Sequence, residues 1–203
     1  MDNIEKELEA GRAVIMPTET VYGIFAKALD QEAVDYIYEL KRRPRDKALN
    51  LNVADEKTIR IYSKNQPSYL TKLIHSFLPG PLTIILQANE KVPNWIHSGL
   101  DTVGFRIPAH PKTLDLIRKY GPLVGPSANL SGHASGTKYR AIVSEFDQVV
   151  PGIEDDEFLT GQDSTILDIS SSKARILRQG SITKADLLAQ VPELSFEEDE
   201  LPQ

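Results

Sequence analysis

The segment RAVIMPTETVYG (residues 12–23) joins a short buried strand to a polar loop. Its first five residues, RAVIM, read as a short buried strand with an apolar run after Arg12, and Pro17 ends that run. The next seven, PTETVYG, are largely polar and close on glycine, which is typical of a loop or of a strand exit. If further buried strands along the chain are also followed by polar loops, the strands can form one sheet whose loops carry the polar side chains of a functional site.

Further strands do follow, and helical patterns separate most of them. Strands are predicted at LNLNV (49–53), LTIILQ (82–87), TVGFRIP (102–108), PLV (122–124), STILDI (164–169) and RILRQG (175–180). Helices are predicted over 3–10, from the N-cap Asp30 to a stop at Pro44, and over 55–62, 68–78, 111–121, 138–146 and 183–191. This alternation indicates an α/β sheet with helices packed on it. We expect one domain over residues 1–192 and an acidic, flexible tail over 193–203.

Composition restricts the class of protein. The 203 residues suffice for one α/β domain, and no window approaches the length of an apolar membrane span, so no membrane partner is expected. The chain has no cysteine and four scattered histidines, so we expect no thiolate site and no zinc. The charged N-terminus does not resemble a secretory signal, which favours a cytoplasmic location. A net charge of −6 argues against wholesale wrapping of nucleic acid but leaves room for a local basic pocket.

The segment KRRPRDK (41–47), called the cationic run below, concentrates five basic residues and one acidic residue at a helix end. One interpretation is that these cations complement the helix dipole and are otherwise solvated, which applies best to Arg42 and Arg45. The other is that they hold an anion, because arginine and lysine both bind phosphate oxygens. Charge alone leaves both interpretations open.

Other polar segments lie at strand ends. The loop GPSANLSGHASGT (125–137) offers hydroxyls, an amide and glycine N–H groups, and Arg106 stands in an otherwise apolar strand, where it needs an anionic partner. That partner is either a structural carboxylate or a substrate carboxylate. Neither GxxxxGK[ST] nor GxGxxG after a strand is present, so side chains and irregular loops must hold any nucleotide, and no flavin or nicotinamide is expected. Together these segments predict one anion-binding cleft.

The motifs PTETVYG, KRRP, VGFRIP, PSANLSG, DSTILDI and ILRQG occur in the order found in the YrdC/TsaC family of threonylcarbamoyl-AMP synthases, which this chain resembles from about residue 12 to 180. The family's KxR and SxN signatures correspond to Lys41 and Arg43 and to Ser127 and Asn129. The resemblance implies a YrdC-like twisted sheet flanked by helices, with a concave, positively lined cleft. It implies that L-threonine, bicarbonate or CO₂, and ATP give threonylcarbamoyl-AMP and pyrophosphate, for the modification of tRNA beside the anticodon.

The resemblance also implies roles for individual residues. Lys41 and Arg43 are expected to be catalytic. The residues expected to bind ATP are Arg43, Lys47, Thr102, Asn129, Thr137 and Arg178, with Lys41 also on the phosphates. The residues expected to bind threonine are Thr20, Asn52, Arg106, Ser127 and Ser164, although this sequence has Asn52 where many relatives have histidine. Mg²⁺ is expected to arrive with ATP, keeping mostly phosphate and water ligands rather than protein ones.

Two other functions fit some of these features. The same fold with a basic concave face could bind RNA phosphates without catalysis, although overall acidity and the lack of aromatics within the cationic run count against this. A carbamoyl-transferring domain of hydrogenase maturation factors occurs in much longer chains with zinc-finger cysteines, which this sequence lacks. For the synthase, tRNA or the tRNA threonylcarbamoyl transferase complex is a further possible partner.

Overall fold

The computed structural model describes residues 2–147 and 150–197. The helices are α1 (Asp2–Glu9), α2 (Gln31–Leu40), α3 (Glu56–Tyr62), α4 (Leu70–Phe77), α5 (Asn94–His97), α6 (Pro111–Tyr120), α7 (Tyr139–Glu145) and α8 (Lys184–Gln190). The strands are β1 (Val14–Met16), β2 (Gly23–Lys27), β3 (Leu51–Asn52), β4 (Ser63–Lys64), β5 (Leu82–Ala88), β6 (Thr102–Arg106), β7 (Leu123–Val124), β8 (Thr165–Asp168) and β9 (Arg175–Arg178).

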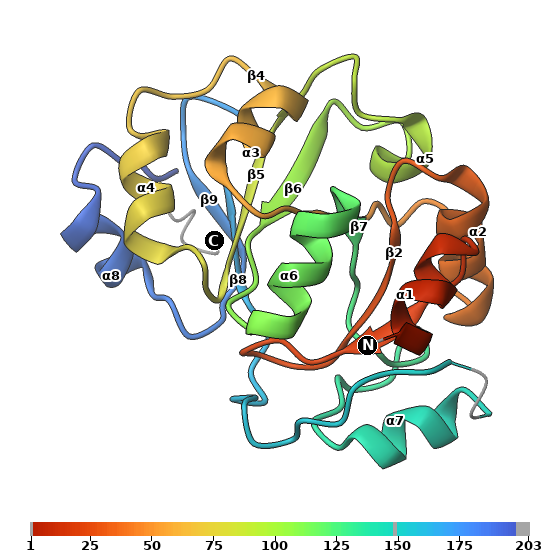
Figure 1. Ribbon diagram of the computed structural model, residues 1–203. Coiled ribbons are helices and arrows are strands. Elements are labelled where there is room, and N and C mark those ends of the chain that lie inside the picture. The colour runs from red at the N-terminus through yellow and green to blue at the C-terminus, as the bar shows by residue number, and fades with distance from the viewer. Residues whose placement is uncertain (1, 148–149, 198–203) are drawn as a thin grey trace.

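The strands form one mixed sheet in the order β1-β2-β7-β3-β6-β5-β8-β9, with β4 pairing on β5 (Figure 1). Two pairs are parallel, β3 with β6 and β5 with β8, and the other pairs along the path are antiparallel. Strands that are neighbours in space are therefore often distant in sequence. The α/β sheet with flanking helices that the sequence predicted is confirmed.

Helix α2 carries the cationic run to its place. Asp30 caps its N-terminus by accepting a hydrogen bond from the backbone N–H of Ala33 at 3.3 Å. Val34, Ile37 and Tyr38 are buried on the face toward the sheet, and each such side chain contributes about 1.5–3 kcal/mol of apolar burial. The helix ends at Leu40, and Arg42 takes a left-handed backbone conformation with φ 50°. The chain thus turns before it reaches Pro44.

The pairing register puts apolar and polar residues on opposite faces of the central strands. Leu51 lies beside Phe105, Phe105 beside Ile84, and Ile84 beside Leu167, and all four are fully buried. Because side chains alternate along a strand, the neighbouring positions face the other way. These include Asn52, which lies beside Arg106. A row of polar groups therefore faces away from the large core.

Sequence patterns missed three elements, which are β2, β4 and α5. Strand β2 has four buried residues in five, so it shows no alternation of apolar and polar positions. Strand β4 has two residues and α5 has four, which is too short for any period to be recognised.

The end of the described chain packs against the sheet. Leu194 is buried, and Ala174 exchanges backbone hydrogen bonds with Ser195 and Glu197 at 2.8 and 3.1 Å. The first residues of the segment expected to be a flexible tail are therefore held beside β9. The rest of that segment, 198–203, lies outside the described residues.

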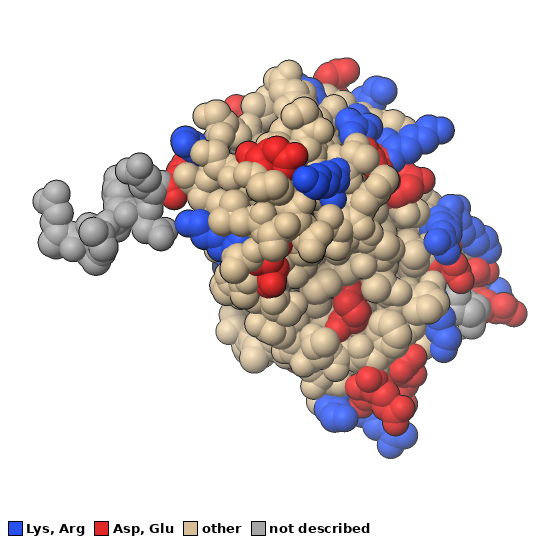
Figure 2. All heavy atoms as spheres, turned by 90° about the vertical axis from the view of Figure 1, so that its left-hand side faces the viewer, with Lys and Arg blue, Asp and Glu red and all other residues tan. Residues whose placement is uncertain are grey.

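In the described part of the chain, no helix is long and apolar enough to cross a membrane. Figure 2 shows the face that carries α4 and α8, where acidic and basic side chains are scattered among uncharged ones. Neither sign of charge dominates that face. Any concentration of positive charge has to lie elsewhere.

Candidate functional site

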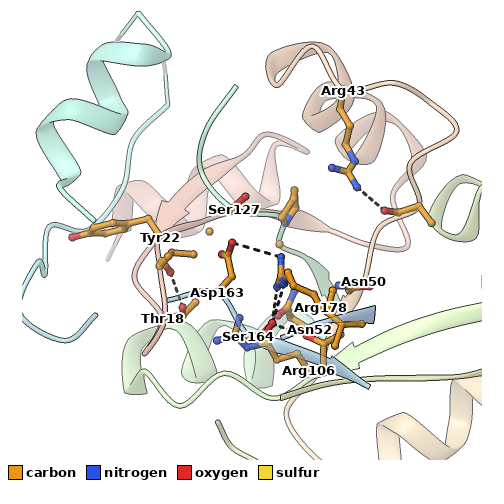
Figure 3. A pocket seen from close by; sticks show the side chains of 17 residues that line it. Thr18, Tyr22, Arg43, Asn50, Asn52, Arg106, Ser127, Asp163, Ser164 and Arg178 are labelled. Carbon is orange, nitrogen blue, oxygen red and sulfur yellow. Dashed lines mark hydrogen bonds and ion pairs between the residues drawn. The ribbon is translucent and has the colours of Figure 1, made fainter. Parts of the chain in front are cut away.

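A cavity of about 260 Å³ opens on the polar side of the central strands (Figure 3). Three arginines reach it from different elements, namely Arg43 from the loop after α2, Arg106 from the end of β6 and Arg178 from the end of β9. Loops 17–22 and 125–127 and the segment before β8 complete the wall. The cavity thus joins polar segments that the sequence analysis expected to meet.

Arg106 is largely buried, and its guanidinium is held on one side by protein groups. One nitrogen, Nη2, donates to Glu19 Oε1 at 2.6 Å and to Thr20 Oγ1 at 2.7 Å. The other oxygen of Glu19 accepts the backbone N–H of Ala109 at 2.9 Å, which fixes the carboxylate in turn. The structure therefore supplies a structural carboxylate for Arg106. The Arg106 Nε is buried and has no hydrogen-bond partner among the described residues, whereas the side chain as a whole lines the cavity and is 13% exposed, so a ligand can meet its exposed part.

A second group of polar side chains lies where β5, β8 and β9 meet. The hydroxyl of Ser164 is buried and lies 3.0 Å from the hydroxyl of Thr83. Arg178 donates to the carbonyl and to the hydroxyl of Ser164, both at 3.0 Å, and its Nη1 lies 3.7 Å from Asp163 Oδ2. These contacts hold Arg178 across the mouth of the cavity, with its side chain 44% exposed and able to meet a ligand.

Tyr22 forms a buried wall on the other side. Its hydroxyl donates to Asp156 Oδ1 at 2.9 Å and accepts the backbone N–H of Asp155 at 2.8 Å. Burial raises the pKa of Tyr22, and the hydrogen bond to the Asp156 carboxylate adds in the same direction. The phenol therefore stays protonated and neutral, and it anchors the loop that precedes β8 to the PTETVYG loop.

Within the cationic run, the arginines have different surroundings. Arg43 lines the cavity and donates to the backbone carbonyls of Lys47 at 3.1 Å and Ala48 at 2.8 Å. Arg45 points elsewhere, pairing with Asp35 and stacking over the ring of Tyr38 at 4.6 Å. The positive charges thus contact carbonyls, a carboxylate and an aromatic face, which offsets the repulsion between neighbouring cations.

Lys41 is almost completely buried and does not line the cavity. Its ammonium donates to the backbone carbonyls of Ser127 and Asn129, and its own carbonyl accepts the N–H of Ser131 at 2.9 Å. Burial lowers the pKa of Lys41 to about 8, and the nearby charge of Arg43 adds to that effect. In this structure Lys41 joins the end of α2 to the SxN loop, and its role on the phosphates stays a prediction.

Other residues expected to bind ATP lie outside the cavity. Asn129 is buried, its amide donates to the carbonyls of Leu130 and His133 at 2.9 Å, and its Oδ1 has no partner among the described residues. Thr102 stands at the opposite end of β6 from Arg106, Thr137 is half-buried in the loop before α7, and Lys47 is exposed. None of these four lines the cavity.

The residues expected to bind threonine come together more closely. Asn52, Arg106, Ser127 and Ser164 all line the cavity. Thr20 is buried behind them and is hydrogen-bonded to Arg106. The structure therefore assembles this group around Arg106, as the resemblance implied.

Several lining residues were not singled out from the sequence. They are Thr18, Asn50, Thr83 and Asp163, and Glu19 belongs with them because it holds Arg106 from behind. Thr18 and Glu19 lie within PTETVYG, and Asp163 immediately precedes Ser164 in DSTILDI, so the motifs contained them. Motif spacing does not distinguish the residues that face the cavity from those that support them.

A mixed sheet with one small polar cavity, lined by three arginines, has the features of a protein that binds a small anionic ligand. The family model named Sua5/YciO/YrdC, described as "Telomere recombination", matches residues 6–180, and the chain belongs to this family. The family and fold that the motif order indicated are confirmed.

Two relatives that are 39% and 38% identical to this chain are both named threonylcarbamoyl-AMP synthase. The threonylcarbamoyl-AMP synthase of Pyrococcus abyssi is 39% identical over 177 residues, covering 86% of this chain and 52% of that protein. The threonylcarbamoyl-AMP synthase of Bacillus subtilis is 38% identical over 185 residues, covering 90% and 54%. The crystal structure of P. abyssi Sua5 complexed with L-threonine superposes with a TM-score of 0.87 at 36% identity, covering 95% of this chain and 57% of that one. The chain thus spans about half the length of these relatives.

Proposed function

We propose that this chain is a threonylcarbamoyl-AMP synthase, which converts L-threonine, bicarbonate or CO₂, and ATP into threonylcarbamoyl-AMP and pyrophosphate. The names of its relatives and the L-threonine bound by P. abyssi Sua5 support this proposal. The observation in this chain that carries it is Arg106, whose guanidinium is held by Glu19 and Thr20 at the wall of a cavity large enough for an amino acid.

Arg106 suits the carboxylate of an amino acid. Its Nη2 is occupied by Glu19 and Thr20, so its orientation is set before any ligand arrives. A carboxylate in the cavity can accept a charge-assisted hydrogen bond from the part of the Arg106 guanidinium that stays exposed. Asn52 and Ser127, which line the same cavity, can bond the remaining polar atoms of threonine.

Arg43 and Arg178 suit the phosphates of ATP. Carbamate formation needs the amine of threonine to attack the carbon donor, and a carbamate oxygen then attacks the α-phosphorus while pyrophosphate leaves. Negative charge increases on phosphate oxygens in this step, so cations already fixed in position lower its barrier. Arg43 and Arg178 are each held by backbone carbonyls and keep further N–H groups for a ligand. We propose that these two residues stabilise the leaving pyrophosphate.

Mg²⁺ enters this scheme as the complex with ATP, where phosphates and water supply most of its ligands. The adenylate then donates threonylcarbamoyl to an adenosine of tRNA beside the anticodon. Accordingly, tRNA or the transferase that acts on it is the partner that consumes the product.

The test is pyrophosphate release from ATP, measured with and without L-threonine and bicarbonate, with a mass spectrum of the nucleotide product. Release that requires both additions, together with the mass of threonylcarbamoyl-AMP, supports the proposal. If ATP binds and no pyrophosphate appears, the synthase reaction is wrong for this chain. Binding to tRNA that weakens steeply with salt would then favour the RNA-binding alternative.

A further inference from the structure

Asp163 is the only acidic residue among the described residues that line the cavity, where its carboxylate points toward Arg178 (Figure 3). It immediately precedes Ser164, at the point where the chain enters β8. Its carboxylate is 37% exposed on the cavity side of the sheet. A carboxylate at this position repels phosphate and bicarbonate, so its presence in an anion-binding cavity requires an explanation.

The contacts of Asp163 with Arg178 and Ser135 are long, so its carboxylate can still accept shorter hydrogen bonds from a ligand. Arg178 Nη1 lies 3.7 Å away, beyond the 2.7–3.2 Å of a direct hydrogen bond, and Arg178 is held more closely by Ser164. Ser135 donates to both carboxylate oxygens at 3.2 and 3.3 Å, which is a shared and long hydrogen bond. An ionised carboxylate has about four acceptor positions, so most remain available.

The sheet brings Asp163 near Arg106. Strand β6, which ends in Arg106, pairs with β5, and β5 pairs with β8, which follows directly after Ser164. Two strand spacings of about 4.8 Å separate the β6 and β8 backbones by about 10 Å, and the register puts Arg106 level with Ile166, three residues after Asp163. Both side chains line the same cavity, so one small molecule in it can contact both of them. That molecule would meet a cation at one end and a carboxylate at the other.

We propose that Asp163 binds the α-ammonium group of the amino-acid substrate whose carboxylate is bound by Arg106. This inference rests on the proposed function and adds the residue that recognises the amine. The ligand class follows from the pair of charges, because an α-amino acid is a zwitterion with an anion and a cation a few ångströms apart. An anionic analogue without the amine would meet only repulsion at Asp163.

Asp163 could instead contribute one ligand to Mg²⁺ on ATP, because carboxylate oxygens are suitable ligands for that ion. The two roles differ in what they require. Recognition of an ammonium group needs neither nucleotide nor metal, whereas a magnesium ligand acts only when both are present. Binding measured in EDTA without ATP therefore separates them.

The experiment compares two ligands by NMR titration, L-threonine and 3-hydroxybutanoate, which keeps the carboxylate and hydroxyl but lacks the amine. Asp163→Asn is expected to weaken L-threonine binding at least about 10-fold, because a charge-assisted contact is lost, while changing 3-hydroxybutanoate binding by less than about 2-fold. Glu157→Gln, an exposed acid in the same loop and outside the cavity, is the matched control for charge and should change neither. Asp163→Glu, which keeps the carboxylate, should retain most of the affinity for L-threonine.

Each other outcome has a definite meaning. Equal weakening of both ligands by Asp163→Asn would show a structural role and overturn the inference, as would unchanged binding of L-threonine. A loss that appears only after Mg²⁺ and ATP are added would assign Asp163 to the metal instead. If the unaltered chain binds ATP but not L-threonine, the proposed function fails and the inference fails with it.

Discussion

The cationic run and the arginines on the strands use the same kind of side chain in different ways. In the run, Lys41 is bonded to a neighbouring loop, Arg45 pairs with Asp35, and only Arg43 lines the cavity. On the strands, Arg106 and Arg178 both line it, and each is fixed by side chains from other segments. A high local density of charge in the sequence therefore does not identify the residues that line the cavity. Which cations line it depends on where the fold directs each side chain.

The largest effect is expected at Arg106. Arg106→Gln should lower kcat/KM for L-threonine at least about 100-fold, because a buried, charge-assisted contact with the substrate carboxylate is lost. Pyrophosphate release at varied L-threonine concentration measures this, and ATP affinity should change less than about 3-fold. The double variant Glu19→Gln, Arg106→Gln removes both charges of the buried pair, so it should recover fold stability without recovering activity. Retained activity in either variant would show that Arg106 is structural.

Within the cationic run, substitution of Arg43 is expected to lower turnover, whereas substitution of Arg45 is not. Arg43→Ala should lower kcat about 10- to 100-fold, because one cation that stabilises the phosphate charge is removed. Arg45→Ala removes the same charge from the same loop, but the side chain lies over Tyr38 and away from the cavity, so turnover should stay within about 2-fold. Equal losses in steady-state assays would mean that total charge, and not position, makes the run functional.

Lys41 is expected to affect the stability of the fold, because it joins the end of α2 to the loop that contains Ser127 and Asn129. Lys41→Met removes the donor to two buried carbonyls and should lower the free energy of unfolding by about 1–3 kcal/mol, measured in urea. The cost should depend on pH. The pKa of Lys41 is lowered to about 8 in the folded state, so the unfolded chain binds the proton more tightly and stability rises with pH between about 8 and 10.5.

The penalty for Lys41→Met should accordingly be greater at pH near 9.5 than near 7, because Met does not titrate. Urea titrations of the unaltered protein and of Lys41→Met are made at both pH values. The difference between their free energies of unfolding cancels the contributions of other titrating groups. A penalty that decreases with pH would mean that the lysine is stabilised in its charged form.

The smallest effect is expected at Arg42, whose backbone φ is 50° while its side chain is exposed. Arg42→Gly should raise the free energy of unfolding by about 0.5–1 kcal/mol, because glycine adopts this conformation without steric cost. Turnover should not change, although the run loses one of its five basic residues. A lower Tm, or a clear drop in turnover, would show that the Arg42 side chain has contacts of its own.

Much of this molecule could be predicted from local patterns. Helix α2 starts at Asp30 as expected, because an N-cap and an apolar stripe are both contained in a few neighbouring residues. The order of the motifs also predicted that Arg106, Ser127 and Ser164 share one site, and all three line the cavity. Such features need only the residues beside them or a known arrangement of motifs.

The remainder depends on contacts between distant segments. Glu19 could not be identified as the partner of Arg106, because the ion pair exists only once loop 17–22 lies against the end of β6. The carbonyls of Ser127 and Asn129 could not be identified as partners of Lys41 for the same reason, since the fold brings them to it. Side-chain direction in a folded protein is a tertiary property, and spacing along the chain does not contain it.

The order of strands in the sheet has a consequence for synthesis on the ribosome. The preceding strand β4 pairs with one end of the second edge of β5, but residues 82–85 on that edge must wait for β8, made much later, and Arg178 enters only with β9. Non-local strand pairing is slow, and chains emerge from the N-terminus onward. A nascent chain therefore carries Arg43 and Arg106 long before the cavity exists, and the wall of the cavity is complete only after β9 has been made.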